Sequence, residues 1–177
     1  MIEVEIKARV EDPKYIERTI IALGATPIGI ENQADTYYNS SSYDFEITDE
    51  ALRIRAQDSK CFFTYKGPKM DNVSKTRKEF EVEINDANVM GDILLSLGFS
   101  PVATIVKKRK LYRIGDFSIS LDNVRSLGDF IEVEIALRDP KNYEEKVESI
   151  FRFIDKLGIN RESTVRESYL EMFLNQK

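Results

Sequence analysis

The tetrapeptide Glu-Val-Glu-Ile occurs three times in this chain of 177 residues, at positions 3–6, 81–84 and 132–135. In each copy carboxylates alternate with branched apolar residues, which is the period of a β-strand with one charged face and one apolar face. Each copy is followed by an amphipathic helical pattern that ends at a Leu-Gly pair, with the glycines at Gly24, Gly98 and Gly158. The chain is therefore expected to consist of charged strands whose apolar side is covered by helices.

The sequence also contains a longer internal repeat. Residues 23–28, Leu-Gly-Ala-Thr-Pro-Ile, correspond to residues 97–102, Leu-Gly-Phe-Ser-Pro-Val, and Tyr38 corresponds to Tyr112 at the same offset. We interpret this as a duplication and predict a single domain over residues 1–177. It would consist of two pseudo-repeats, at about 1–75 and 76–150, followed by C-terminal helices that reach residue 177.

Each half is expected to contain a strand, a helix and three further strands. The predicted strands are 2–9, 28–38, 51–57 and 61–66 in the first half, and 76–84, 102–113, 117–124 and 129–137 in the second. Eight strands can close into a barrel without free edges. The predicted fold is thus an α+β closed eight-stranded antiparallel β-barrel with helices packed outside. The last two helices are expected near 139–158 and 166–174, and loops at 39–49 and 67–74.

Alternation along these strands sorts the side chains into faces. A single face collects seven cations and eight carboxylates: Lys7, Arg53, Arg55, Lys66, Arg77, Lys107 and Arg109, with Glu3, Glu5, Glu79, Glu81, Glu83, Asp122, Glu132 and Glu134. A half-exposed sheet with its charged face in water is the commoner arrangement. Like charges two residues apart, as at Glu3 and Glu5, nevertheless repel each other without benefit on such a face. Because the helices can cover the apolar face, we expect the charged face to line the inside of the barrel.

The mixture of charges points to a particular kind of ligand. An unpaired charge in a dry interior costs about several kcal/mol, so the interior is expected to be a wet tunnel. Converging lysines and arginines can bind several phosphates in a row, and arginine does so with two parallel hydrogen bonds. Carboxylates are ligands for hard cations such as Mg²⁺ or Mn²⁺. Together these groups predict a site for a metal-bound polyphosphate chain.

Composition excludes several other classes of function. The chain has no histidine and one cysteine, which excludes imidazole bases, thiolate zinc sites and intrachain disulfides. Its formal net charge of −5 argues against nucleic acid and anionic membranes as partners. No apolar stretch is long enough to span a membrane, and the first residues do not resemble a signal peptide. We therefore expect a cytoplasmic protein.

The ordered set of charged motifs resembles the CYTH superfamily of triphosphate-tunnel enzymes. Glu3-x-Glu5-x-Lys7 is similar to its E-x-E-x-K signature, and further matching motifs follow in the expected order along nearly the whole chain: Leu52-Arg53-Ile54-Arg55, Lys66-Gly67-Pro68, Arg77-Lys78-Glu79-Phe80-Glu81, Lys107-Lys108-Arg109, Asp122 and the run from Leu127 to Glu134. The run from Leu97 to Phe130 looks most like class IV (CyaB-type) adenylyl cyclases. Met1 and Ile2 stand before Glu3 of the signature, whereas bacterial cyclases of this class carry a short extension there.

The resemblance implies roles for individual residues. The triphosphate would be held by the seven cations Lys7, Arg53, Arg55, Lys66, Arg77, Lys107 and Arg109. The metal ions would be held mainly by Glu3, Glu5, Glu132 and Glu134, with Glu79, Glu81 and Asp122 as further ligands or neighbours of ligands. Among these residues, Glu5, Lys7 and Glu132 are the expected catalytic residues.

Three functions remain open at this point. A class IV cyclase would convert ATP to 3′,5′-cyclic AMP and pyrophosphate. A phosphohydrolase would act on tripolyphosphate, thiamine triphosphate or a nucleoside triphosphate in a similar tunnel. A non-catalytic protein would only bind a polyphosphate or nucleotide. Apolar helix faces left over beyond the barrel would suit a homodimer.

Overall fold

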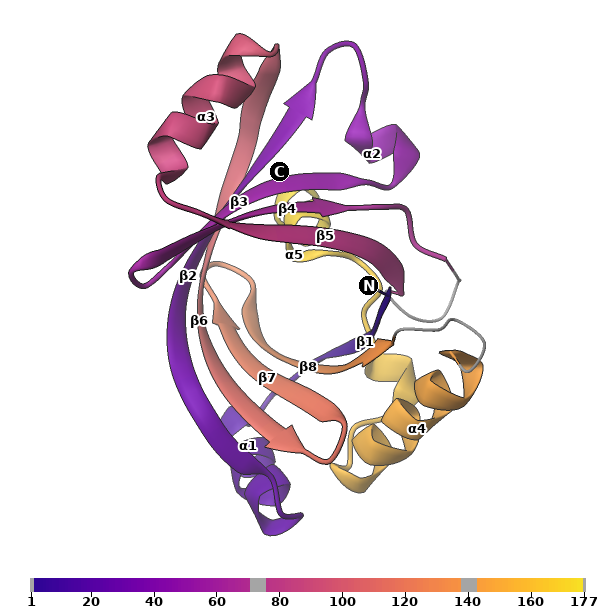
Figure 1. The fold of residues 1–177 in the computed structure, drawn as a ribbon. Helices are drawn as coiled ribbons and strands as arrows, with labels where there is room; N and C mark the ends of the chain where they lie inside the picture. Colours follow the sequence, from indigo (N-terminus) through magenta and orange to yellow (C-terminus); the bar gives the residue numbers. More distant parts are fainter. Residues whose placement is uncertain (1, 71–75, 138–142, 177) are drawn as a thin grey trace.

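The computed structural model of the chain describes residues 2–70, 76–137 and 143–176 (Figure 1). Its helices and strands, in chain order, are β1 (Ile2–Arg9), α1 (Pro13–Ala22), β2 (Thr26–Ser40), α2 (Phe45–Thr48), β3 (Ala51–Gln57), β4 (Lys60–Lys66), β5 (Arg77–Ile84), α3 (Ala87–Ser96), β6 (Phe99–Ile114), β7 (Phe117–Val124), β8 (Gly128–Leu137), α4 (Tyr143–Lys156) and α5 (Tyr169–Leu174). A 3₁₀ turn at Arg161–Ser163 precedes α5. The order strand, helix, strand, strand, strand thus occurs twice, with α2 added in the first half. The duplication itself stays a prediction.

The strands form a closed barrel in the order β1-β5-β4-β3-β2-β6-β7-β8, and every neighbouring pair is antiparallel (Figure 1). The predicted fold class is confirmed. β2 and β6, the equivalent strands of the two halves, pair from Thr26 opposite Arg113 to Ser40 opposite Phe99. Because this ladder joins the halves over almost their full length, it fixes the register of one half against the other.

The barrel closes by a short contact between β1 and β5. These strands pair at Ile2 with Lys78 and at Glu3 with Arg77. Further along β1, the segment that follows the 3₁₀ turn lies beside the strand: Thr164 forms a bridge with Ala8, and the Val165 N–H donates to the Lys7 carbonyl at 2.7 Å. The C-terminal segment therefore provides backbone hydrogen bonds where β5 diverges from β1.

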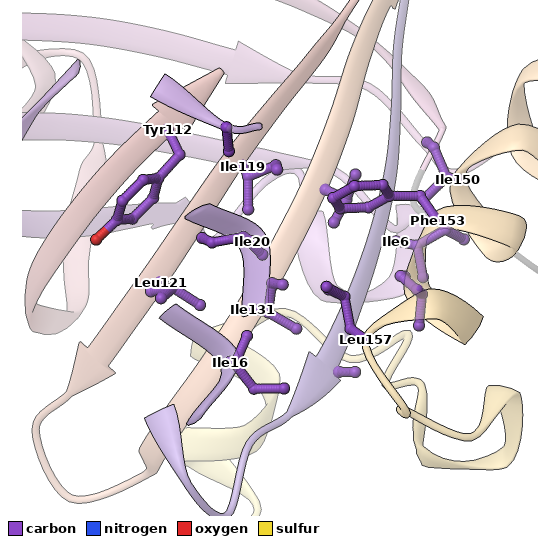
Figure 2. Packing of buried hydrophobic residues seen from close by; sticks show 14 of the residues in the cluster. Ile6, Ile16, Ile20, Tyr112, Ile119, Leu121, Ile131, Ile150, Phe153 and Leu157 are labelled. Carbon is purple, nitrogen blue, oxygen red and sulfur yellow. The ribbon is translucent and has the colours of Figure 1, made fainter. Parts of the chain in front are cut away.

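Helices α1 and α4 cover the apolar outer face of β1, β7 and β8 (Figure 2). Asp12 caps α1 by accepting from two backbone N–H groups, and Pro13 occupies the first turn, as its fixed φ favours. Ile20 of α1 and Ile150 of α4 are fully buried against the barrel. The period-two strands and the amphipathic helices thus meet as the sequence predicts.

The segment 39–49, expected to be a loop, contains more structure than predicted. β2 continues to Ser40, and α2 occupies Phe45–Thr48. Asp44 caps this helix by accepting from the Glu46 N–H at 3.0 Å, and Phe45 packs against Leu52 and Leu94. The serines and turn-forming residues of this segment predict a loop, although Asp44 can cap a helix and Phe45 can anchor it in the core. The other predicted loop, 67–74, and the predicted start of α4 at 139–140 lie partly or wholly outside the described residues.

The position of α5 differs from the prediction that every helix packs outside. Tyr169 and Met172 of α5 form a buried cluster with Tyr37, Ile105 and Phe130. These three strand residues share the inward faces of their strands with Asp35, Lys107 and Glu132, so α5 fills one end of the barrel interior (Figure 1). The inward face is therefore charged over part of its length and apolar at this end. Within the described residues, none of the helices has the length and apolar character to cross a membrane.

Truncation of Ile150 to alanine should destabilise the protein by about 2–5 kcal/mol, because it removes a fully buried side chain between α4 and the barrel. Ile47→Ala provides the matched control, since Ile47 lies on α2 with 82% of its surface exposed and should cost no more than about 0.5 kcal/mol. Urea unfolding of both variants measures the difference. An equal decrease in the free energy of unfolding for both variants would contradict the packing of α4 on the barrel.

Candidate functional site

The inward-facing charges form two walls on opposite sides of the barrel. The cationic wall consists of Arg53 and Arg55 of β3 with Lys107 and Arg109 of β6, on either side of β2. The carboxylate wall, on the neighbouring strands β8, β1 and β5, consists of Glu132, Glu134, Glu3, Glu5, Glu79 and Glu81. All ten side chains line one cavity of about 960 Å³. The expected interior of mixed charge is thus present, with most cations on one side and most carboxylates on the other.

Asp35 of β2 lies in the middle of the cationic wall. Its carboxylate accepts from Arg55 Nε at 2.7 Å and Nη2 at 2.9 Å, and from Lys107 Nζ at 2.6 Å. Arg53 Nη1 lies 3.5 Å from the same carboxylate, which is 1% exposed. Burial alone would raise the pKa of Asp35, but Arg53, Lys107 and Arg55 outweigh it and hold the pKa well below its usual range. Asp35 therefore stays charged and neutralises part of this wall.

Arg109 connects the two walls. Its Nε donates to Asp122 Oδ1 at 2.7 Å, and its Nη2 contacts both Asp122 and Glu132. Asp122 also accepts from the Tyr169 hydroxyl at 2.9 Å and is 2% exposed. Of the described residues, those that line the cavity do not include Asp122. The carboxylate that the resemblance assigns to metal binding thus lies behind Arg109, where it orients the guanidinium.

Lys7 is likewise covered by the C-terminal segment. Its Nζ donates to the Glu167 carbonyl and lies 4.2 Å from the centre of the Tyr169 ring and 5.8 Å from that of Phe130. The side chain is 1% exposed and is not among the described residues that line the cavity. In this structure, Tyr169 and the residues before α5 separate Lys7 from the cavity. Its role in phosphate binding and catalysis stays a prediction.

The carboxylate wall carries more negative charge than its neighbours balance. Burial, followed by the charges of Glu79 and Glu134, raises the pKa of Glu3 to about 8. Burial and then Glu5, which lies opposite on β1, raise the pKa of Glu134 to about 7. Two groups on this wall therefore hold protons near neutral pH in the absence of a cation.

Two cations lie on the carboxylate side of the cavity: Arg77 on β5 itself and Lys66 on the neighbouring strand β4. Burial alone would raise the pKa of Glu79, but its ion pair with Lys66, together with Arg53 and a hydrogen bond with Glu3, lowers it. Arg77 is buried and has its Nη2 3.9 Å from Asp49 Oδ1. Both cations line the cavity, as the resemblance implies for phosphate-binding groups.

Glu81 lies where the carboxylate wall approaches the cationic wall. It accepts from the Thr64 hydroxyl at 2.9 Å and lies 3.4 Å from Arg53 Nη2. Thr64 is fully buried and also accepts from Arg53 Nη2 at 3.0 Å. Thr64 therefore orders both charged side chains at this junction.

The carboxylates of this wall suit a hard divalent cation, although their side chains do not converge on one point in this structure. No three Asp, Glu or Cys side chains of the described residues are close enough together to hold a metal ion as they stand. The available donors are carboxylate oxygens, which Mg²⁺ and Mn²⁺ prefer. The raised pKa values of Glu3 and Glu134 indicate an excess of negative charge that a cation would relieve. Glu3, Glu5, Glu132 and Glu134 are the residues that would hold it.

Two functional candidates were missed in the sequence. Asp35 shares the inward face of β2 with Tyr37, so alternation along the predicted strand 28–38 could have placed it among the charged residues. The helical spacing of Tyr169 with Met172 and Phe173 predicts only a packing role. It does pack, at 6% exposure, but it also lines the cavity and hydrogen-bonds Asp122. A helical apolar pattern cannot distinguish the outside of a barrel from its interior.

Comparison with known proteins identifies the type of domain. The model of the family described as "CYTH domain" matches residues 1–169. A protein of Methanocaldococcus jannaschii named "putative adenylate cyclase" is 41% identical over 172 residues, which are 97% of this chain and 98% of that protein. An Aeromonas hydrophila protein named adenylate cyclase CyaB is 26% identical over 170 residues, covering 94% of this chain and 86% of that protein. A solved structure from Pyrococcus horikoshii has a TM-score of 0.90 and 37% identity over 99% of both chains.

The pKa values of the carboxylate wall predict opposite effects of pH on the protein with and without metal. Because the folded protein binds protons on Glu3 and Glu134 more tightly than the unfolded chain, their contribution to stability is fully present below a pH of about 4.5. It is lost as the pH rises through about 7 to 8. Mg²⁺ or Mn²⁺ needs these groups deprotonated, so either ion should raise the midpoint of thermal unfolding more at high pH than at low pH.

Thermal unfolding at pH values of about 6 and 8.5, with and without metal, tests this expectation. The double variant Glu3→Gln with Glu134→Gln should lose most of the pH-dependent metal effect. Glu144→Gln with Glu145→Gln changes the net charge equally at two exposed positions of α4 and should keep it. If the metal raises the unfolding midpoint of the Glu3→Gln, Glu134→Gln variant as much as that of wild type, these carboxylates do not hold the ion.

Proposed function

The chain belongs to the CYTH family, and on this premise we propose that it is a metal-dependent enzyme that acts on a triphosphate bound inside the barrel, as a cyclase of the class IV type. Such an enzyme converts ATP to 3′,5′-cyclic AMP and pyrophosphate. The two curated relatives described above carry the name adenylate cyclase, which supports this choice. Some members of the family are triphosphatases, so the cyclase reaction requires a direct test.

The separation of charge across the cavity is the observation that carries the proposal. A row of phosphates can lie along the cationic wall while the carboxylate wall holds metal ions on its other side. A site for a simple anion would gain nothing from six glutamates facing it. Members of this family are generally metal-dependent, in agreement with the donor set found here.

The residues of the chain have distinct tasks in this reaction. Arg53, Arg55 and Lys107 would bind the oxygens of the triphosphate and fix its course along β3 and β6. Glu3, Glu5, Glu132 and Glu134 would hold Mg²⁺ or Mn²⁺. The ion would supply Lewis-acid activation of the ribose 3′-hydroxyl and the α-phosphate. Arg109 would contact the phosphate chain once a phosphate replaces Glu132 as its partner.

The cavity also has room for an organic group attached to the triphosphate. Besides the charged walls it is lined by aromatic and aliphatic residues: Tyr37, Tyr38, Phe45, Val102 and Leu170. Such side chains suit a base or another ring, which a bare tripolyphosphate lacks.

Product analysis decides between the two reactions. The purified protein is incubated with ATP and Mg²⁺ or Mn²⁺, and the products are separated by chromatography, with tripolyphosphate as a parallel substrate. Cyclic AMP with pyrophosphate is the expected result. ADP with phosphate, or faster turnover of tripolyphosphate, would assign the protein to the phosphohydrolases instead, and binding without turnover at any metal concentration would make it a sensor.

Glu5→Gln should reduce metal-dependent turnover by more than about a hundredfold, because loss of a metal ligand costs more than loss of a residue that orients one. The fold should survive, since the substitution is nearly isosteric. Glu11→Gln, an exposed glutamate just beyond the same strand, should leave turnover unchanged. Initial rates over a range of Mn²⁺ concentrations give the comparison. Wild-type rates in the Glu5 variant would remove Glu5 from the metal site.

A further inference from the structure

Asp35 occupies an unexpected place for a carboxylate. It lies among the cations that are proposed to bind phosphate, and both of its oxygens are engaged: Oδ1 accepts from Arg55, and Oδ2 accepts from Arg55 and Lys107 and lies close to Arg53. Asp35 lines the cavity, but it is only 1% exposed and both of its oxygens are used by cations, so it has no oxygen left to hold a metal ion. Its contacts are with the groups that would contact substrate.

We propose that Asp35 is a positioning residue that arranges Arg53, Arg55 and Lys107 to bind a chain of condensed phosphates in preference to a single phosphate. The inference rests on the proposed function, because it takes these three cations to be the phosphate-binding groups. The paired hydrogen bonds from Arg55 fix the plane and direction of its guanidinium. The contact of 2.6 Å fixes the Lys107 amine relative to it.

The spacing of the cations explains why an anion is needed among them. The side chains from β3 and β6 converge on β2 from opposite sides, and without a negative charge between them they would repel one another. Asp35 holds them together at fixed positions while leaving the wall with a net positive charge. A chain of several phosphates matches several fixed cations, whereas a single phosphate needs only one or two of them.

The proposal predicts an effect opposite in sign to that of simple electrostatics. Removal of a negative charge from a cationic wall should strengthen binding of any anion if charge alone matters. If Asp35 positions the cations, its removal should weaken binding of a condensed phosphate, since the cations lose their arrangement. The sign of the change therefore separates the two explanations.

The pKa of Lys107 provides a second readout. Burial, with Arg55 and Arg109, lowers this pKa to about 7, while Asp35 and Asp122 oppose the decrease. The groups that act on the Lys107 amine are Asp35 of β2, Arg55 of β3, Arg109 of its own strand, Asp122 of β7 and the ring of Tyr169 in α5. Phosphate affinity should fall as rising pH deprotonates Lys107. Without Asp35 the pKa of Lys107 is lower, so this fall should begin at a lower pH. This shift reports the direct ion pair between Asp35 and Lys107, whereas the affinities for tripolyphosphate and phosphate report the arrangement of the three cations.

Isothermal titration calorimetry with tripolyphosphate and with inorganic phosphate tests the proposal. A chelator in the buffer keeps turnover out of the measurement. Asp35→Asn should lower the affinity for tripolyphosphate by at least about tenfold, the size of one charge-assisted hydrogen bond, and that for phosphate by much less. Asp35→Glu, which keeps the charge but displaces it by one methylene, should fall between wild type and Asp35→Asn. Glu17→Gln removes a carboxylate that binds Lys110 on the outer face of β6 and should change neither affinity.

The outcomes distinguish this inference from the function on which it rests. If wild-type protein binds tripolyphosphate neither in the chelator nor with Mg²⁺ in its place, the proposed function fails. If wild type binds it and Asp35→Asn binds it equally well or better, Asp35 is not a positioning residue. If Asp35→Asn does not fold, as judged by circular dichroism, Asp35→Glu decides, and wild-type affinity in that variant overturns the proposal. If neither variant folds, Asp35 serves stability alone and the proposal is likewise overturned.

Discussion

Charge balance inside the barrel is the constraint on which the rest of the structure depends. Ionised groups removed from water are costly unless other charges and hydrogen bonds compensate them. On one side of the interior, the charge of Asp35 is shared by three cations. Arg109 forms ion pairs with Asp122 and Glu132. The carboxylate wall is left with an excess, which appears as raised pKa values at Glu3 and Glu134. The interior thus keeps a reduced positive charge on the cationic wall and an excess of negative charge where a cation would bind.

Much of the fold could be predicted from local patterns because strand alternation and helix periodicity report which side of an element is apolar. Val4 and Ile6 are buried under α1 and α4, as the repeated tetrapeptide indicates. The prediction was wrong for α5, since its apolar stripe packs against Phe130 inside the barrel. Whether an apolar helix covers the outer or the inner face depends on tertiary packing, which a pattern within one segment does not contain.

The candidate site could be predicted as a set of charges but not as an arrangement. The motifs supplied the residues of both walls, and alternation gave them a common face. Pairing across strands determines which charges meet, so the contacts of Asp35 cannot be read from its own strand. The placement of Tyr169 inside the barrel, which also depends on tertiary packing, separates Lys7 from the cavity. Asp35 stands in no charged motif of its own strand. Its importance arises from β3 and β6, which are adjacent to β2 in the barrel but distant in sequence.

Stability and substrate binding depend on alternate residues of the same strands. In β1 the even positions Val4 and Ile6 pack under the helices, while the odd positions Glu3 and Glu5 face the cavity. Because the side-chain period of a strand is two, a shift of β1 by one residue would exchange the two sets and destroy both the core and the site. A substitution on the inward face, in contrast, leaves the packed outer face in place. The helix-covered outer layer therefore allows the interior to keep charges that a barrel without that layer could not tolerate.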